Sequence, residues 1–133
     1  MEIVFLIARI LFAALFLGSA FAHLTQTEAM AGYAGSKGVP QPKLATQAAG
    51  VLMLVGALSV LLGVWGDLGS LFLVAFLAPT AVIMHNFWKE TDATNKEMEM
   101  VQFLKDVALA GAALAFFVVF RADPDLTITS SLF

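Results

Sequence analysis

Two histidines and a short set of acidic and amide side chains stand at the ends of otherwise apolar segments, where they could bind a ligand or move protons. His23 lies near the end of one apolar run, and His85 ends another within the sequence MHNFWKETD. Imidazole changes its charge near neutral pH, so it can donate, accept or carry a proton. Glu99, Gln102 and Asp106 follow the spacing i, i+3, i+7 and therefore share one face of a helix.

Four apolar segments of membrane-spanning length must position these side chains. They cover residues 3–24, 44–65, 68–88 and 100–120, and the only charged residues inside them are Arg9, Lys105 and Asp106. Each holds about 20 residues, which at 1.5 Å per residue matches a hydrocarbon core of about 30 Å. The chain of 133 residues is 60% hydrophobic and 13% charged, far more apolar than soluble proteins. We predict an all-α integral membrane protein, an antiparallel four-helix bundle that forms a single domain over residues 1–133.

The connections between the segments predict the topology. Residues 25–43 contain three glycines and two prolines, which predicts one long loop whose first half could form a short helical turn. Only Gly66 and Asp67 separate the second and third segments, which predicts a tight hairpin. Both termini then lie on one side, A, and the long loop and the charged residues 89–99 lie on the other, side B. Side B carries Lys37, Lys43, Lys89 and Lys96, so the positive-inside rule makes it cytoplasmic.

The first segment is expected to stay in the protein as a membrane span. Ala20-Phe21-Ala22 resembles a signal-peptide cleavage site, but Glu2 stands where a basic cluster is usual and Arg9 interrupts the apolar run. We therefore expect a multi-pass protein of a bacterial or archaeal cell membrane, surrounded by the lipid bilayer.

Composition disfavours several classes of function. The chain has no cysteine, which removes disulfides, thiolate metal sites and thiol redox chemistry. Its net charge of −3 offers no basic surface for nucleic acid. Two histidines without a firm third ligand do not predict a metal site.

The polar groups within the spans should gather in one layer on side B, because the first and third segments end there and the second and fourth begin there. Such groups are costly to expose to lipid, so they should point inward or pair with one another. The candidate ligand-binding residues are His23, Gln47, His85, Trp88, Gln102 and Asp106.

Several of these residues have a second interpretation. Trp88 is also typical of the aromatic belt at a membrane surface. Lys105 could extend to the lipid headgroups or pair with Asp106, for which His85, His23 and Gln47 are the other inward partners.

Arg9 lies about two turns into the first segment, where an unpaired guanidinium is costly. It could contact a lipid phosphate or form a structural ion pair with Asp67 or Asp123. Pro79 in the third segment could kink that helix or simply pack. Gly50, Gly56 and Gly63 could support a homo-oligomer or be used inside the monomer.

Three ordered motifs resemble the DoxX family of small four-helix membrane proteins: MAGYAGSKGVPQPKLATQAAGVLMLVGALSVLLG, MHNFWKETD and EMVQFLKDVALAGAAL. The family's Gly-x-Pro-x-Pro loop falls on Gly38, Pro40 and Pro42, its His-x-Phe-Trp on His85, Phe87 and Trp88, and its Phe-Leu-Lys-Asn on Phe103, Leu104, Lys105 and Asp106. Asp106 departs from the family, because an acid stands where asparagine is common. The acid could add a proton or cation site, and it argues against any role that needs a neutral amide here.

The resemblance implies a link to membrane redox complexes, including quinol oxidase and thiosulfate–quinone oxidoreductase assemblies. Our first hypothesis is an accessory or ligand-holding subunit of such an assembly, with redox proteins of the membrane as partners. No cofactor is firmly implied, but the B-side layer could hold a quinone or another apolar ligand. The alternative is a non-catalytic scaffold that binds lipids or partner proteins. The chain has no nucleophile triad, phosphate loop or metal quartet, so any redox activity is expected within a quinone-linked complex rather than in a stand-alone enzyme.

Overall fold

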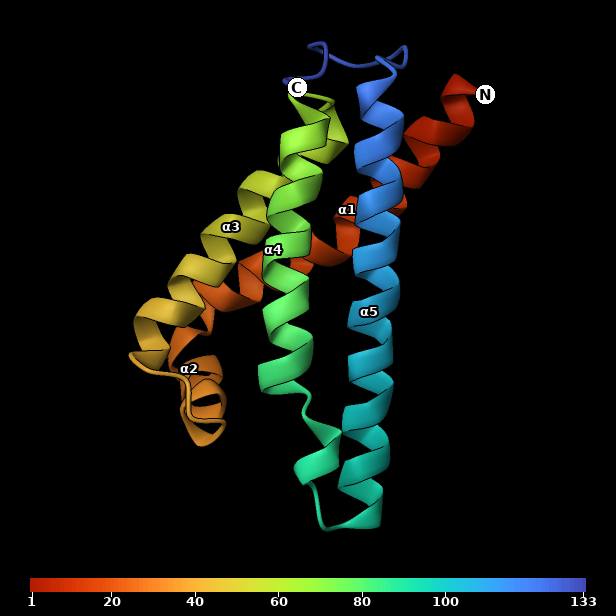
Figure 1. Cartoon of the computed structure of the whole chain (residues 1–133). Coiled ribbons are helices and arrows are strands. Elements are labelled where there is room, and N and C mark those ends of the chain that lie inside the picture. Colours follow the sequence, from red (N-terminus) through yellow and green to blue (C-terminus); the bar gives the residue numbers. More distant parts are fainter.

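Four long helices form the body of the molecule, and each is long and apolar enough to cross a membrane. The computed structural model describes residues 1–133. The helices are α1 (Glu2–Thr25), the short α2 (Thr27–Ser36), α3 (Pro42–Leu62), α4 (Gly66–Met84) with the 3₁₀ turn η1 (Phe87–Lys89), and α5 (Ala93–Arg121). Both termini lie at end A, and α2 and η1 lie at end B (Figure 1). The prediction of an all-α protein with four apolar helices is confirmed.

Local signals set where the long helices begin and end. Pro42 occupies the first turn of α3, where its missing N–H has no helical partner to lose. Gly63 ends α3 in the left-handed region, with φ of 67°. The hairpin turn is therefore residues 63–65, and Gly66 and Asp67 already belong to α4, unlike the prediction. The Asp92 carboxylate accepts the N–H of Asn95, so α5 begins in the charged segment before its apolar run.

The segment predicted as one long loop is mostly helical, which corrects that expectation. The helix α2 covers Thr27–Ser36, and only Gln26 and residues 37–41 lie outside the helices. Alanines favour the helix, and Ala31 and Ala34 are buried where α2 packs on α3. The glycines within α2 were a misleading signal, because burial of its alanine face outweighs their weak helix propensity.

The helices pack in the order α1, α3, α4, α5 across the bundle, with α2 against α3 at end B (Figure 1). Glycines allow the closest approaches. A side chain at Gly50 would meet Leu24 and His23 of α1 within about 3 Å, and one at Gly56 would meet Leu73 of α4 at 3.0 Å. These small-residue surfaces are thus used inside the chain, and a homo-oligomer stays a prediction.

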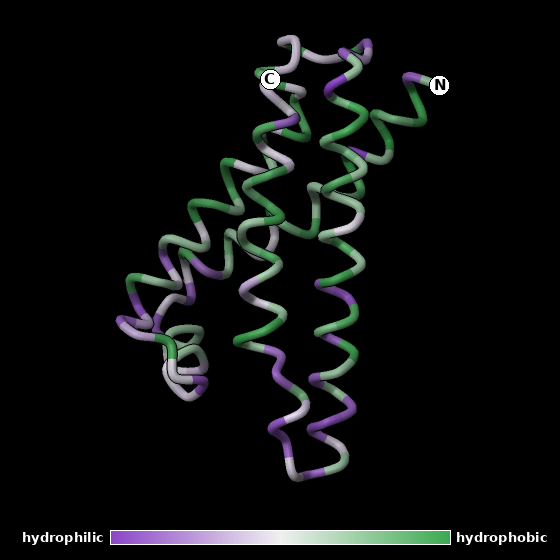
Figure 2. Tube along the Cα trace, viewed as in Figure 1, coloured by the Kyte–Doolittle hydropathy of each residue, from purple (hydrophilic) through white to green (hydrophobic).

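Most of the apolar surface faces outward. No more than 33% of any span is buried within the protein, and large side chains such as Leu11 and Val118 are 71% and 65% exposed. Hydrophobic residues fill the middle of the long helices, and hydrophilic residues concentrate at end B (Figure 2). Lipid is the solvent that suits this surface, and the protein is membrane-embedded.

Arg9 stabilises end A in a way that the sequence did not indicate. It is 1% exposed, and its guanidinium donates to the carbonyls of Val60 and Leu61 in the last turn of α3 and to the Leu126 carbonyl, at 2.9, 2.6 and 2.7 Å. The last carbonyls of a helix lack partners within it and carry partial negative charge. Arg9 therefore caps α3.

Neither carboxylate suggested as a partner of Arg9 pairs with it. Asp67, fully buried, accepts the N–H groups of Leu132 and Phe133 at 2.8 and 3.0 Å, and Asp123 accepts the N–H of Ser131 at 2.6 Å. These bonds fold the C-terminal segment over end A.

Candidate functional site

A cavity of about 840 Å³, which we call the inner cavity, lies in the B-side half of the bundle. All five α-helices contribute to it, and most of its wall is apolar, with Leu15, Leu52, Phe76 and Ile83 among the lining residues. The side chains that bring polar groups to this wall are Ser19, His23, Tyr33, Thr46, Thr80, His85, Glu99, Gln102, Lys105 and Asp106. An apolar cavity with a few polar groups is the usual form of a small-molecule site.

The structure brings four of the six predicted ligand-binding residues to this cavity: His23, His85, Gln102 and Asp106. Gln47 is exposed on α3 and does not line it, although its neighbours Thr46 and Ala48 do. Trp88 is 49% exposed and packs edge-on against Phe87 and Phe103, with ring centroids at 5.3 and 5.7 Å. Trp88 thus attaches η1 to α5 instead of reaching the cavity.

His85 lies between two carboxylates of α5. Its Nδ1 is 2.7 Å from Glu99 Oε2, a hydrogen bond that the ring donates. Its Nε2 is 3.6 Å from Asp106 Oδ2, which is an ion-pair distance and longer than a hydrogen bond. His85 also follows directly after α4, so its ring lies near the negative end of that helix dipole.

Asp106 has an incomplete set of partners. The residue is 5% exposed, and its Oδ2 accepts no hydrogen bond from the protein. Lys105, the neighbouring cation, instead donates to Gln102 Oε1 at 2.5 Å. A buried carboxylate in this situation must be neutralised, pair with His85 or receive a donor from a ligand.

His23 offers a hydrogen-bond acceptor to the cavity. Its Nδ1 lies 2.7 Å from the Ser19 carbonyl, an oxygen that can only accept, so Nδ1 carries the proton. In the neutral ring Nε2 therefore presents a lone pair. The edge-on ring of Phe76, with its centroid 6.2 Å away, holds the imidazole in place.

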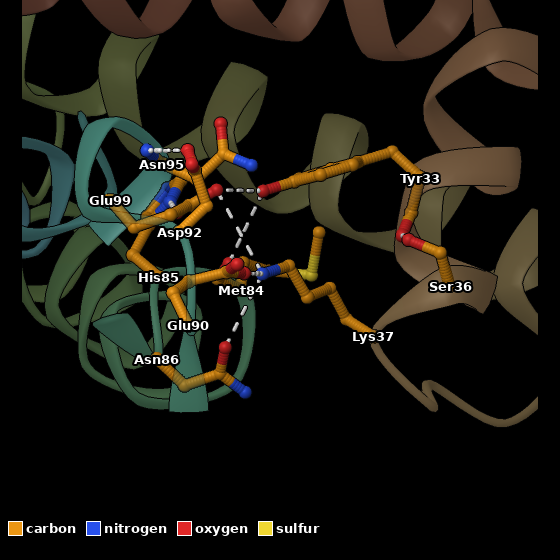
Figure 3. A network of polar contacts seen from close by, with 10 residues as sticks. All are labelled: Tyr33, Ser36, Lys37, Met84, His85, Asn86, Glu90, Asp92, Asn95 and Glu99. Carbon is orange, nitrogen blue, oxygen red and sulfur yellow. Dashed lines mark hydrogen bonds and ion pairs between the residues drawn. The ribbon is translucent and has the colours of Figure 1, made fainter. Parts of the chain in front are cut away.

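A second, more polar cavity of about 680 Å³, the outer cavity, lies beside the inner one at end B. Its lining includes Tyr33 and Lys37 together with Asn86, Glu90 and Glu99. Lys37 Nζ is 3.3 Å from Glu90 Oε1 and 3.8 Å from Glu99 Oε1, and it donates to Asn86 Oδ1 at 3.3 Å. These contacts join the end of α2 to the segment around η1 and to α5 (Figure 3).

Tyr33 closes this network from α2. Its hydroxyl donates to Glu99 Oε1 at 2.6 Å (Figure 3). Partial burial, the hydrogen bond to Glu99 and the negative charges of Glu99 and Glu90 all raise the pKa of Tyr33 above its usual value of 10.0. The phenol is therefore a neutral donor at physiological pH.

Sequence reasoning missed Tyr33, Lys37 and Glu90 as parts of the site. Their signal was weak, because Tyr33 and Lys37 lie in the segment interpreted as a loop and Glu90 lies among other solvent-exposed charges. Glu99 was recognised only as a neighbour of Gln102 and Asp106 on one helix face.

Comparison with known proteins agrees with the architecture. The DoxX family profile matches residues 4–86. The chain is 32% identical to the inner membrane protein YphA of Escherichia coli (strain K12) over 113 residues, which is 84% of this chain and 79% of that protein. No solved structure matches. With the family match covering more than half of the chain, this membrane-embedded protein belongs to the DoxX family.

Proposed function

We propose that the inner cavity binds a membrane-soluble molecule with an apolar body and a hydrogen-bonding head, and that this molecule is a quinone. The protein would then serve as a ligand-holding subunit of a quinone-linked redox assembly in a bacterial inner membrane. The observation that carries the proposal is the apolar cavity of about 840 Å³ that holds both His23 and the unpartnered Asp106.

The size and chemistry of the cavity suit this class of ligand. Small-molecule sites usually measure about 300–1,000 Å³ and combine apolar walls with a few polar groups. A quinone needs donors for its carbonyl oxygens, which Lys105 and a protonated His85 or Asp106 supply. Its reduced form needs acceptors for two hydroxyls, which His23 Nε2 and an ionised Asp106 supply.

The position of the cavity also supports a lipid-borne ligand. Exposed residues of the spans, among them Leu15, Ala48 and Pro79, line it and so place part of its rim at the outer surface of the bundle. Pro79 lacks the N–H that would bond the Ala75 carbonyl, and both residues line the cavity. The family resemblance to proteins of quinone-linked assemblies points to the same ligand class.

Binding of a short-chain quinone and its quinol to the protein in lipid nanodiscs tests the proposal. We expect Asp106→Asn, which replaces a charged acceptor with a weaker neutral one, and His23→Ala, which removes an acceptor, each to weaken binding of the quinol about tenfold, or about 1.4 kcal/mol. The matched control is Gln47→Ala, which removes a polar group at the same end of the bundle but outside the cavity. No binding by the wild-type protein, or an equal effect of Gln47→Ala, would contradict the proposal.

A further inference from the structure

We infer that Asp106, His85 and Glu99 form a proton relay between the inner cavity and water at end B. The relay would exchange protons with whatever occupies the inner cavity. It deepens the proposed function, which supplies that occupant, but the arrangement of the three residues stands without a ligand and is tested without one.

The first support is the place of His85 between two carboxylates. Imidazole is the side chain that can accept a proton on one nitrogen while it releases another from the second. Nδ1 already has its acceptor, Glu99 Oε2, at 2.7 Å, and Nε2 faces Asp106 Oδ2 at 3.6 Å. A small rotation of the Asp106 side chain brings Oδ2 within hydrogen-bond distance of Nε2 and completes the path.

The second support is the state of Asp106. The Asp106 side chain is buried, and its Oδ2 receives no hydrogen bond from the protein. It lines the inner cavity. A structural carboxylate at such depth normally has its oxygens satisfied. Asp106 is instead available to a proton or to a donor on a ligand.

The third support is the position of Glu99 between the two cavities. Glu99, Tyr33 and Met98 line both the inner and the outer cavity. Glu99 therefore belongs to the wall that separates an apolar space from a polar one. The relay leads from Asp106, which lines only the inner cavity, to Glu99, which lines both.

One proton moves outward in three balanced steps. Protonated Asp106 gives its proton to His85 Nε2, and His85 Nδ1 gives its own proton to Glu99, so the imidazole stays neutral and changes tautomer. Glu99 then releases its proton to water in the outer cavity. A flip of the ring then turns the protonated Nε2 toward Glu99 and the unprotonated Nδ1 toward Asp106, and Asp106 takes a new proton from a donor in the inner cavity.

Charged groups from several elements surround the relay. Lys37 lies 3.8 Å from Glu99 Oε1 and the Tyr33 hydroxyl donates to the same oxygen, so a deprotonated Glu99 is stabilised from α2 and the segment after it. The other ionisable groups that face this region are Glu90 beside Lys37, Lys105 next to Asp106 on α5, and His23 on α1 across the inner cavity. Hence His85 lies between two acids. Lys37 is within ion-pair distance of Glu99, whereas Asp106 forms an ion pair with neither a lysine nor an arginine.

Hydrogen–deuterium exchange of the Asp106 carboxyl group tests the relay in proteoliposomes without ligand. The infrared carbonyl band of a protonated buried acid, assigned through its loss in Asp106→Asn, should shift quickly in D₂O. His85→Gln replaces the imidazole with an amide, which can hydrogen-bond but cannot pass a proton. In this variant exchange should slow about a hundredfold, the scale at which a positioned acid or base acts. The control is Glu97→Gln, which changes an exposed acid on the same helix. In this variant the Asp106 carboxyl group should exchange at the wild-type rate.

Chemical rescue separates a relay from a merely structural role. His85→Ala should also exchange slowly, and imidazole added to the buffer should restore the rate. The absence of any protonated carboxyl band that depends on Asp106, or wild-type exchange in a folded His85→Gln protein, would overturn the relay. Quinone binding measured on the same samples keeps the two claims apart, because slow exchange in His85→Gln supports the relay even in a protein that binds no quinone.

Discussion

The hydroxyl of Tyr33 donates a 2.6 Å hydrogen bond to Glu99, a residue 66 positions later in the chain. This bond ties α2, the short helix at end B, to the beginning of the last membrane span. It also orients Glu99, whose other oxygen accepts the hydrogen bond from His85. The contact thus links the wall of the outer cavity to the polar groups of the inner one.

Tyr33 should ionise only at unusually high pH, and it is the sole tyrosine in the chain. Its pKa is raised above 10.0, so its contribution to stability is fully present below pH 10 and is lost as the pH rises through the folded value. Ultraviolet absorbance should show little tyrosinate at pH 10.0, where an unperturbed phenol is half ionised. Glu99→Gln should lower the midpoint, and an unshifted midpoint in both proteins would contradict the hydrogen bond.

Arg9 should be required for stability at end A. Arg9→Met leaves the carbonyls of Val60, Leu61 and Leu126 without their donor and should lower the free energy of unfolding by about 2–4 kcal/mol. Arg9→Lys should recover only part of this, because an ammonium lacks the planar fork of donors. Equilibrium unfolding in detergent measures the free energy of unfolding of both variants. The matched control is Arg121→Met, an exposed arginine that should change little; equal losses at both positions would argue against the cap.

The close approach of α1 and α3 at Gly50 should tolerate no side chain. A Cβ there would lie 2.9 Å from Leu24 and 3.0 Å from His23, so Gly50→Ala should destabilise the protein by about 1–3 kcal/mol through overpacking. It should also shift His23 in the inner cavity and weaken quinol binding. Gly18→Ala is the control, since a Cβ at Gly18 meets nothing within 4 Å. Equal behaviour of the two variants would show that the helices can separate freely at Gly50.

The sequence was sufficient for the architecture because each span is long, apolar and nearly free of charge. It also placed the polar residues at one end, since hairpin topology and helical spacing bring His85 and Asp106 together. It could not show which polar side chains point inward. Thr46 and Gln47 are neighbours on α3, but they lie on different faces of the helix, and only Thr46 is buried. Tyr33 and Lys37 were not predicted as parts of the site, because their contacts depend on how α2 packs. The glycines in this segment had indicated a loop instead of a helix.

The same limit applies to Arg9. Its depth in α1 correctly indicated a need for partners, but a search among carboxylates could not find them. The partners are main-chain carbonyls at the end of another helix, and these exist only once α3 has formed and ended at Gly63. The sequence identifies ionisable side chains, but it does not show which main-chain carbonyls will lie close to them in the folded protein.

Filling the inner cavity should remove its ligand without changing a single polar group. Ala49 lines the cavity, so Ala49→Trp should weaken quinone binding at least tenfold, or about 1.4 kcal/mol. Ala108→Trp is the control, because Ala108 is exposed on α5 and outside the cavity. Binding by a folded Ala49→Trp protein with wild-type affinity would place the ligand elsewhere.

The most direct test of the central claim is to identify what the inner cavity holds. Protein purified in native membrane patches, then extracted and analysed by mass spectrometry, should yield quinone in near-stoichiometric amount from the wild type and from Ala108→Trp, and far less from Ala49→Trp and Asp106→Asn. Equal, trace quinone in all four preparations, together with no binding of added quinone, would contradict the account.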